Sequence, residues 1–315
     1  MGHPRIAVIV PCYNEGVAIG RVVADFRKAL PEAAIHVFDN DSEDDTVEQA
    51  RKAGAQVGRV RLRGKGHVVR RLFADVDADV YLLVDGDDTY SAACAPRLVE
   101  RLQEEGHDMV VGVREATGTL AYRAGHVLGN RLLTGFLGWL FGRPCKDILS
   151  GYRVFSRRFV KSFPAQSGGF EIETELTVHA LELHMSIGEI PTPYKERPEG
   201  SVSKLSTWRD GFRIMRTILK LFSTERPIIF YGALSLFTAL LGVALGMPLL
   251  LTYLETGLVP RIPTAILVTA LAVVSMLAMV AGLVLDAVAR GRRELKALAY
   301  LRWPSPTVGP IDAGD

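Results

Sequence analysis

The chain is poor in cysteine and carries almost no net charge. Its 315 residues include three cysteines, Cys12, Cys94 and Cys145, and no two of them stand at C-x-x-C spacing. We therefore expect neither a zinc site nor a disulfide framework, and the thiols fit a reducing compartment. The net charge of +2 and the isoelectric point of about 8.4 give no case for binding nucleic acid. The first apolar run begins at Ile6, so no signal peptide is expected.

Charge is absent from two long stretches near the C-terminus. Residues 228–254 and 262–285 contain no Asp, Glu, Lys or Arg, and each exceeds the roughly 20 residues that a helix needs to cross a bilayer. Basic residues flank the pair on both sides, at Arg213, Arg216, Lys220, Arg226, Arg290, Arg292, Arg293 and Lys296. Because cytoplasmic flanks carry the excess of Lys and Arg, the sequence predicts an integral protein of the cytoplasmic membrane with two spans and both termini in the cytoplasm.

An amphipathic helix is predicted directly before the first apolar stretch, at 204–226. Its apolar residues recur at spacings of three and four, and its cations fall largely on the other side. The apolar positions are Leu205, Trp208, Phe212, Met215, Ile218, Leu219 and Phe222. This pattern is typical of a helix that lies in the membrane interface, and the alternative is an amphipathic helix packed on the preceding domain.

Two aspartates follow a short apolar run in the N-terminal half. Residues 80–84 read V-Y-L-L-V, which predicts a buried strand, and Asp85-Gly86-Asp87 follow directly. Ligands of open parallel sheets bind beyond the carboxyl ends of the strands. Two crowded carboxylates repel each other, and a hard divalent cation relieves that repulsion. We therefore predict that Asp85 and Asp87 bind Mg²⁺ or Mn²⁺; an acidic turn capping the next helix is the alternative.

Two earlier apolar runs also end in polar clusters. Residues 6–10 are followed by P-C-Y-N-E, residues 35–38 by D-N-D-S-E-D-D-T, and a helical pattern follows each cluster. Three such clusters at the ends of three strands predict a doubly wound α/β domain with its site at one edge of the sheet. Ser42 with Asp45 resembles a capping box, so helix capping is the alternative for that cluster.

These motifs, with R-G-K-G at 63–66, together resemble the inverting family 2 glycosyltransferases, in the branch of dolichol-phosphate mannose synthase and other polyprenyl-phosphate glycosyltransferases. The resemblance covers roughly residues 5–225. It implies the A-type nucleotide-sugar transferase fold, a doubly wound and mostly parallel sheet. The donor-binding residues that it implies are Pro11, Tyr13, Asn14, Glu15, Asp39, Asp41, Lys65, Asp85, Gly86 and Asp87.

The predicted order of domains follows from this resemblance and from the apolar stretches. A cytoplasmic catalytic domain occupies residues 1–203, the amphipathic helix 204–226, the transmembrane hairpin 227–289 and a cytoplasmic tail 290–315. One position departs from the mannose synthase pattern D-A-D-x-Q, because Thr89 stands where the glutamine is found. A third side-chain ligand to the metal is therefore in doubt.

The acceptor side is predicted from residues 114–158. Arg123 and Arg131 stand in a largely apolar helical stretch, and D-I-L-S-G-Y-R at 147–153 resembles the segment that lines the acceptor side in the polyprenyl-phosphate branch. Guanidinium groups pair phosphate bidentately, so we expect Arg123, Arg131 and Arg153 to hold an acceptor phosphate. The alternative is that the first two reach out to solvent. The predicted catalytic residues are Asp85, Asp87, Arg131, Asp147, Ser150, Arg153 and Glu173.

The predicted reaction is metal-dependent, inverting transfer of a hexose from a nucleotide-diphosphate sugar to a polyprenyl phosphate at the cytoplasmic membrane face. UDP-glucose or UDP-N-acetylglucosamine is favoured as donor, and GDP-mannose is the alternative. A lipid phosphate is already an anion and can attack C1 without a base, so catalysis is expected to rest on positioning and charge neutralisation. An aspartate acting as base stays open.

Three other functions compete with this prediction. D-G-D-D-T also fits a phosphatase nucleophile motif, although no convincing second acidic pair follows it. A processive polysaccharide synthase shares the donor motifs, but this sequence lacks its Q-x-x-R-W motif. The third alternative is a non-catalytic membrane protein that binds nucleotide sugars. Small residues at Gly242, Gly246 and Gly282 are of the kind that lets membrane helices associate into a homo-oligomer.

Overall fold

The structure is a computed structural model that describes residues 4–116, 134–135, 138–139, 146–198 and 207–306. The chain divides into two compact units, and each is described by itself. The first unit runs to Ile218 and resumes at Lys296, and the second comprises Leu219–Leu295. The first unit thus includes the last residues of the second long apolar helix.

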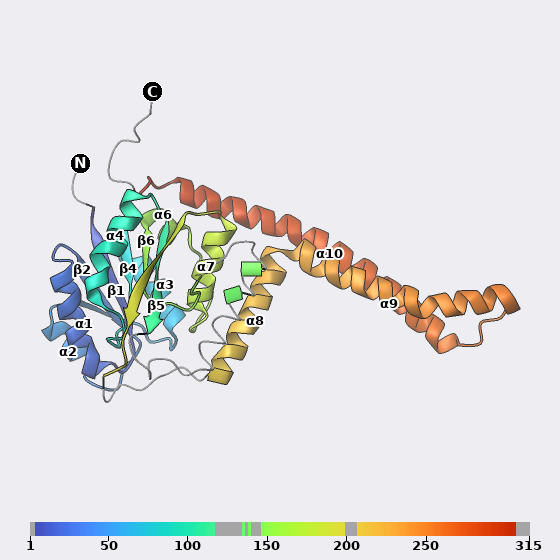
Figure 1. Ribbon diagram of the computed structural model, residues 1–315, viewed down its shortest axis with the longest axis horizontal. Coiled ribbons are helices and arrows are strands. Elements are labelled where there is room, and N and C mark those ends of the chain that lie inside the picture. The colour runs from blue at the N-terminus through green and yellow to red at the C-terminus, as the bar shows by residue number, and fades with distance from the viewer. Residues whose placement is uncertain (1–3, 117–133, 136–137, 140–145, 199–206, 307–315) are drawn as a thin grey trace, which may run out of the picture. The chain divides into compact units, whose positions relative to one another are not determined.

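The first unit is built on a seven-stranded sheet in the order β3-β2-β1-β4-β6-β5-β7 (Figure 1). β1 pairs in parallel with β2 and β4, β2 with β3, and β5 with β7, whereas β6 is antiparallel to both β4 and β5. The strands are β1 (Ile6–Cys12), β2 (Ala34–Asp39), β3 (Gln56–Arg59), β4 (Val80–Leu83), β5 (Met109–Ala116), β6 (Arg153–Ser156) and β7 (Ile187–Tyr194). The predicted doubly wound, mostly parallel fold is confirmed.

Helices cover both faces of this sheet, which explains why its central strands are apolar throughout. Along β1, Val8 and Val10 pack on one face with α1 and α4, and Ala7 and Ile9 pack on the other with α3, α6 and α7. The helices are α1 (Gly16–Ala29), α2 (Thr46–Lys52), α3 (Lys65–Asp75), α4 (Ala95–Glu104), α6 (Arg157–Ser162) and α7 (Ile172–Glu182), with the 3₁₀ turn η1 at Ala92–Cys94.

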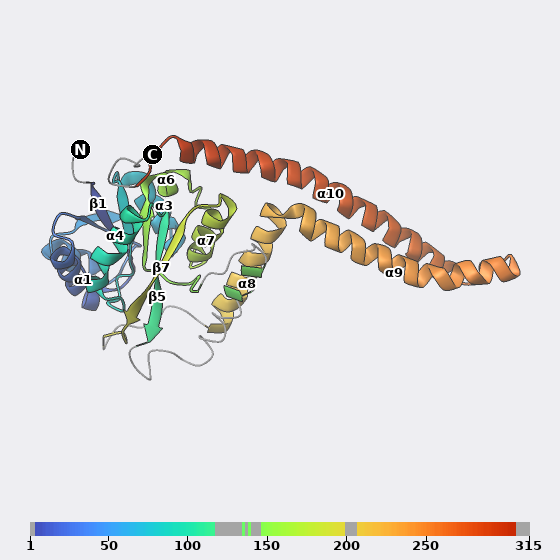
Figure 2. The ribbon, with the colours of Figure 1, turned by 45° about the horizontal axis from the view of Figure 1, so that its top comes forward.

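The direction of the strands fixes where the polar clusters meet. β6 is antiparallel to its two neighbours, so β5 and β7 run in the same direction as β4 and β1. The parallel strands β5 and β7 lie side by side in Figure 2. The segments after β1, β2, β4 and β7 therefore leave the sheet at one edge, which is where ligands of such sheets bind.

The second unit comprises the end of α8 (Thr207–Glu225) and most of two long apolar helices. α9 (Pro227–Thr256) and α10 (Ile262–Leu301) have mean hydropathies of 2.2 and 2.5 in their most apolar windows, of which 17% and 11% is buried. A core helix of a soluble protein would bury most of such a stretch. By length and composition, both helices are candidate membrane spans.

Small residues bring α9 and α10 together. Ser275 Oγ donates to the carbonyl of Ser235 at 2.9 Å, a Cβ at Gly246 would stand 3.3 Å from Val268, and one at Gly282 would stand 3.1 Å from Tyr231. The glycines that suggested an oligomer therefore contact the other helix of the same chain. This packing within one chain does not test the predicted homo-oligomer.

The end of α10 and the residues after it pack on the first unit. The Lys296 ammonium lies 2.6 Å from the Glu182 carboxylate, and the Tyr300 hydroxyl donates to Asp108 at 2.9 Å. Arg158 stacks over the Tyr300 ring at 4.6 Å. The predicted cytoplasmic tail begins at residue 290. In the structure, residues 290–295 are grouped with the second unit and those from Lys296 with the first, where Arg157 stacks over the Trp303 ring at 4.2 Å.

Candidate functional site

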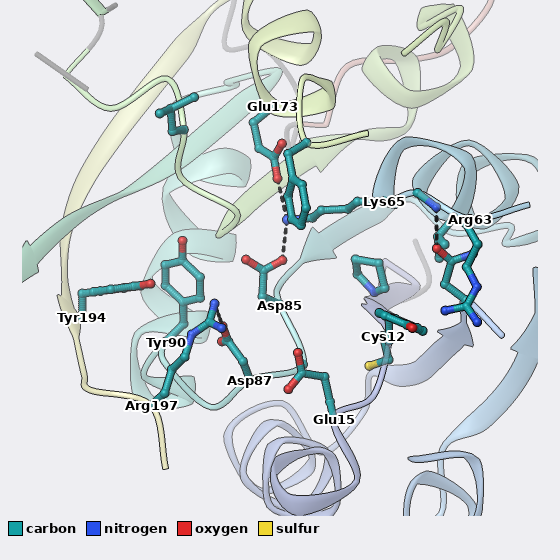
Figure 3. Close-up of a pocket in the computed structure, with 18 of the residues that line it drawn as sticks. Cys12, Glu15, Arg63, Lys65, Asp85, Asp87, Tyr90, Glu173, Tyr194 and Arg197 are labelled. Carbon is teal, nitrogen blue, oxygen red and sulfur yellow. Dashed lines mark hydrogen bonds and ion pairs between the residues drawn. The ribbon is translucent and has the colours of Figure 1, made fainter. Parts of the chain in front are cut away.

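A cavity of about 360 Å³ opens at the edge of the sheet where the parallel strands end. Figure 3 shows Arg63 on one side of it, Tyr90 and Tyr194 on the opposite side, and Asp85 between them. Seven predicted donor residues line the cavity: Pro11, Tyr13, Glu15, Lys65, Asp85, Gly86 and Asp87. Glu173, predicted on the catalytic side, also lines it. The structure thus brings together residues that are scattered over the first two hundred positions.

Asp85 and Asp87 follow β4 directly and both face the cavity (Figure 3). Asp87 is only 4% exposed, and burial, followed by the charge of Asp85, raises its pKa. The Thr89 hydroxyl donates to Asp87 Oδ1 at 2.6 Å. Thr89 stands where the D-A-D-x-Q pattern has its glutamine, and in this structure it orients Asp87. A Cβ at Gly151 would stand 2.5 Å from Asp85 Oδ2, so a larger residue there would displace this carboxylate.

Lys65 connects two acids of the site. It is the first residue of α3, and its ammonium pairs with Asp85 and lies 2.5 Å from Glu173 Oε1. Burial alone would lower the pKa of Lys65, but the charges of Asp85 and Glu173 outweigh it and raise that pKa. Burial raises the pKa of Glu173 in spite of the opposing charge of Lys65. The lysine is therefore a fixed cation between two carboxylates.

Arg197 is a site residue that the sequence analysis missed. It stands three residues after the end of β7, and its guanidinium lies 2.7 Å from Asp87 (Figure 3). No short motif marks it. The signal that could have found it is the direction of β7, because a strand parallel to β4 must deliver its next residues to the same edge.

A close contact between two loops places Lys65 and Glu173 opposite each other. Gly64 has φ +129°, and a Cβ there would stand 2.1 Å from the carbonyl oxygen of Gly168. The Gly66 amide donates to the same oxygen at 3.1 Å. Glu175 accepts hydrogen bonds from the amides of Gln166 and Ser167 at 2.9 and 2.8 Å, which holds the second loop in place. The R-G-K-G motif thus needs its glycines because another backbone packs directly against it.

The side of the cavity around Arg63 carries groups suited to a nucleoside. The Arg63 guanidinium stacks on the Tyr13 ring at 4.3 Å. Asn40 donates to the carbonyls of Val60 and Leu62 at 3.0 and 2.7 Å and is itself a lining residue that was not predicted. A planar base could stack on the exposed side of such flat groups.

Three predicted donor residues do not line this cavity. Asn14 accepts a hydrogen bond from the Glu43 amide at 2.9 Å, Asp39 accepts one from the Ser42 amide at 3.1 Å, and Asp41 pairs with Arg59. Asn14 and Asp41 have φ of 50° and 64°, in the left-handed region. These three side chains stabilise the loops after β1 and β2 and do not line the cavity.

The D-x-x-S-G-Y-R segment also has a structural role. Asp147 is 4% exposed and forms a bidentate pair with Arg114, at 2.7 and 2.8 Å. Ser150 is fully buried and donates to the carbonyl of Gly112 at 2.6 Å. Neither Asp147 nor Ser150 lines the cavity, but Arg114 does. Asp147 therefore fixes the guanidinium of Arg114, a lining arginine that the sequence analysis did not select.

Arg153 is not placed where an acceptor phosphate could reach it. Its side chain is 0% exposed and donates to the carbonyls of Ser150 and Ile148 at 2.8 and 2.7 Å and to Thr177 Oγ1 at 2.8 Å. We therefore correct its predicted role: Arg153 ties the segment before β6 to α7. Arg123 and Arg131 lie outside the residues that the structure describes.

The acids of the site fit a divalent cation in number and kind. In the described part of the chain, no group of three or more His, Cys, Asp or Glu side chains is arranged around a metal position. Proteins that bind Mg²⁺ together with a phosphate group nevertheless usually supply only one or two carboxylate ligands, here Asp85 and Asp87. Phosphate oxygens and water complete the coordination. Burial, followed by the charge of Asp85, raises the pKa of Asp87, and a bound cation would offset the repulsion between the two carboxylates.

Comparisons with known proteins agree with this geometry. The sequence model of the family described as Glycosyl transferase family 2 matches residues 7–162. Glycosyltransferase AglJ of Haloferax volcanii is 34% identical over 77% of this chain and 80% of its own length. The dolichyl-phosphate hexose transferase of the same organism is 30% identical over 70% of this chain and 95% of its own.

Solved structures share the fold. Glucosyl-3-phosphoglycerate synthase from Mycobacterium tuberculosis, in complex with Mn²⁺, uridine diphosphate and phosphoglyceric acid, superposes with a TM-score of 0.58. It is 22% identical and covers 70% of this chain and 78% of its own. At that identity the likeness establishes the architecture of the catalytic unit.

Proposed function

The chain belongs to glycosyl transferase family 2, and we propose that it transfers a hexose from a nucleotide-diphosphate sugar to a polyprenyl phosphate, with inversion at the anomeric carbon. The observation that carries this proposal is the arrangement around Asp85 and Asp87. Each acid faces the cavity and each is paired with a cation from elsewhere in the fold, Lys65 or Arg197.

The cavity offers three groups of contacts in the order that a nucleotide sugar requires. Tyr13, Asn40 and Arg63 suit the nucleoside, and the acids with Lys65 and Arg197 suit the diphosphate. A UDP-linked donor, UDP-glucose or UDP-N-acetylglucosamine, is favoured over GDP-mannose, because a solved structure with the same fold binds uridine diphosphate. The hexose would then lie towards Glu173 and the tyrosines on the opposite side.

A divalent cation, Mg²⁺ or Mn²⁺, held by Asp85 and Asp87 would neutralise the charge that develops on the leaving diphosphate. The chain's own part is to hold these two carboxylates in place. Thr89 fixes Asp87 by a hydrogen bond, and Lys65 fixes Asp85 by an ion pair. Lys65 and Arg197 also supply positive charge. Because ion pairs already hold both side chains in the cavity wall, they need not reorganise during the reaction.

Arg114 is the described residue that best suits the acceptor phosphate. It lines the cavity, and the bidentate pair with buried Asp147 fixes the plane of its guanidinium. We include Arg123 and Arg131 in the same role, on the sequence pattern alone. An acceptor phosphate is anionic at neutral pH and can attack C1 itself, so the proposed reaction needs positioning more than a general base.

The apolar helices support a lipid acceptor. If α9 and α10 both cross the membrane, the chain returns to the side it started from, and the contacts of Lys296 and Tyr300 with the first unit agree with this. The basic residues that flank the two candidate spans support a cytoplasmic location for that side. The exposed Phe212 and Leu219 on α8 fit a helix at the interface.

The test is a transfer assay with the purified full chain in detergent. Radiolabelled UDP-glucose, UDP-N-acetylglucosamine and GDP-mannose are each offered with a short polyprenyl phosphate and a divalent cation. We expect a lipid-extractable product from one donor and none when the polyprenol lacks its phosphate. Release of free hexose without a lipid product, or equal transfer to the unphosphorylated polyprenol, would overturn the proposal.

A further inference from the structure

Both carboxylate oxygens of Asp87 are engaged by other groups of the chain. Oδ1 accepts hydrogen bonds from the hydroxyl and the amide of Thr89, at 2.6 and 3.2 Å. Oδ2 lies 2.7 Å from a guanidinium nitrogen of Arg197 (Figure 3). A metal ion that binds this carboxylate must therefore displace one of its two partners or lie directly beside the guanidinium.

The fold holds these two partners with different firmness. Thr89 is buried, and its carbonyl accepts a hydrogen bond from the Lys195 amide at 2.8 Å, which ties its backbone to the segment after β7. Arg197 lies in residues 195–198, which form neither helix nor strand, and its side chain is 26% exposed. The guanidinium of Arg197 is thus the group that can leave Asp87 without disturbing the surrounding backbone.

The partner of Asp85 is held more firmly. Lys65 begins α3, its side chain is only 10% exposed, and it pairs with Asp85 and with Glu173 together. A lysine between two carboxylates keeps one partner when the other gains a cation. The difference between a metal ion excluded from the acids and one bound to them therefore lies with Arg197.

The charge of Arg197 opposes a metal ion at Asp87, and a phosphate anion would remove that opposition. Like charges a few ångströms apart in a partly buried site repel strongly, so a divalent cation alone meets a barrier there. A guanidinium pairs bidentately with phosphate oxygens and more weakly with a single carboxylate oxygen. A diphosphate beside the two acids offers Arg197 such a partner and leaves Asp87 Oδ2 to the metal.

We propose that Arg197 makes metal binding conditional on the diphosphate: paired with Asp87 it excludes a divalent cation, and paired with the diphosphate it admits one. The inference rests on the proposed function, because the anion is the diphosphate of the nucleotide sugar. Arg197 is a positioning residue here, since it acts on the metal through Asp87. By linkage, the metal must raise the affinity for the diphosphate by the same factor as the diphosphate raises that for the metal.

The experiment measures Mn²⁺ binding to the full chain in detergent, from the electron paramagnetic resonance signal of unbound Mn²⁺. Without any phosphate compound, Arg197→Gln should bind Mn²⁺ about tenfold or more tightly than the wild type, because the repelling charge is gone. Arg197→Lys keeps that charge and should stay close to the wild type. An arginine that only stabilises the site would show the opposite sign, since its loss would weaken Mn²⁺ binding.

The second series adds inorganic pyrophosphate, with a protein-free blank for the complex that forms in solution. Pyrophosphate should raise the Mn²⁺ affinity of the wild type by a factor that is about tenfold or more larger than in Arg197→Gln. Arg21→Gln is the matched control, because Arg21 pairs with the adjacent Asp88 at 3.3 Å and its side chain is 65% exposed. This control should behave as the wild type in both series.

Two results would overturn the inference: equal Mn²⁺ affinities of Arg197→Gln and the wild type without pyrophosphate, or an equal gain in Arg21→Gln. Calorimetry with a nucleoside diphosphate distinguishes this failure from that of the proposed function. A chain that binds no nucleoside diphosphate contradicts both. A chain that shows the predicted coupling but transfers no hexose to a lipid phosphate contradicts the proposed reaction alone.

Discussion

The guanidinium of Arg197 lies 2.7 Å from the carboxylate of Asp87, an acid that is 4% exposed. Lys65 pairs in the same way with Asp85. Both acids that are proposed to hold a metal are therefore already neutralised by cations of the chain. A nucleoside diphosphate that brings its own metal gives Arg197 a second anion to pair with. The cavity is thus balanced in charge before the donor arrives.

The first prediction concerns Arg197. Arg197→Gln should lower the affinity for the nucleoside diphosphate about ten- to a hundredfold, because one charge-assisted contact in a partly buried site is lost. Calorimetry in the presence of Mn²⁺ measures this. Arg21→Gln is the matched control, since Arg21 pairs with the adjacent Asp88 but its side chain is 65% exposed. Equal affinities in both variants and the wild type would remove Arg197 from the donor site.

The second prediction concerns the metal. Chelation of divalent cations, or Asp87→Asn, should reduce transfer on the order of a hundredfold or more, because a ligand to the ion that stabilises the leaving diphosphate is lost. Thr89→Val should cost less, since it removes only the hydrogen bond that orients Asp87. Rates are measured with Mg²⁺ or Mn²⁺ titrated back into chelated enzyme. Full activity in excess EDTA would contradict the metal site.

The third prediction follows from a buried histidine. Burial, followed by the nearby charge of Lys296, lowers the pKa of His179 from 6.5 to about 3. Below pH 6.5 the unfolded chain takes up a proton that the folded chain does not, so stability is complete above that pH and falls as the pH drops towards 3. The loss is about 1.4 kcal/mol per pH unit at most.

His179→Gln should flatten this acid dependence. The variant keeps a group that can bond to Ser162, which lies 3.1 Å from His179 Nε2. Unfolding midpoints between pH 7 and 4 measure the effect, with His184→Asn as the control because His184 is exposed and has the positive φ that asparagine tolerates. Identical pH profiles for His179→Gln and the wild type would contradict the assignment.

The fourth prediction concerns the C-terminal segment. Tyr300→Phe should destabilise the catalytic unit by about 1 kcal/mol through loss of the hydrogen bond to Asp108, and lower Tm by about 2–4 °C. Truncation after Leu295 should lower Tm further, since it also removes the ammonium that pairs with Glu182. Thermal unfolding in detergent measures both. If truncation has no effect, the predicted boundary at residue 290 is the better one.

The fifth prediction concerns the acceptor. Arg131→Ala should raise KM for the polyprenyl phosphate or lower kcat about ten- to a hundredfold, and leave nucleotide affinity nearly unchanged. Arg131→Lys should recover part of the loss, because the ammonium keeps the charge but not the planar fork. Kinetics with donor and acceptor varied independently decide the matter. An effect on nucleotide binding of the same size would move Arg131 to the donor side.

The donor half of the site could be predicted because its chemistry is local. Asp85 and Asp87 stand two and four residues after the end of β4, and Lys65 is the first residue of α3, so short motifs place them. Arg197 and Arg114 could not be found this way. Arg197 depends on the direction of β7, and Arg114 lies within β5, so both follow from the pairing of distant strands rather than from neighbours in the sequence.

Arg153 shows the converse error. Its motif pointed to a phosphate, but a short antiparallel strand turns this side chain into the space between the sheet and α7, where carbonyl groups and Thr177 receive its hydrogen bonds. The motif specifies that an arginine stands at this position, but not on which face of the strand its side chain lies. That face is decided by register, which a single sequence leaves open here.

The contact between Tyr300 and Asp108 also bears on how the protein is made. Translation delivers residues up to Ile218 first, then both apolar helices, and the partners of Asp108 and Glu182 last. The first unit therefore cannot be completed until both α9 and α10 have been synthesised. If these helices span the membrane as we propose, completion of the enzyme also depends on insertion of the hairpin.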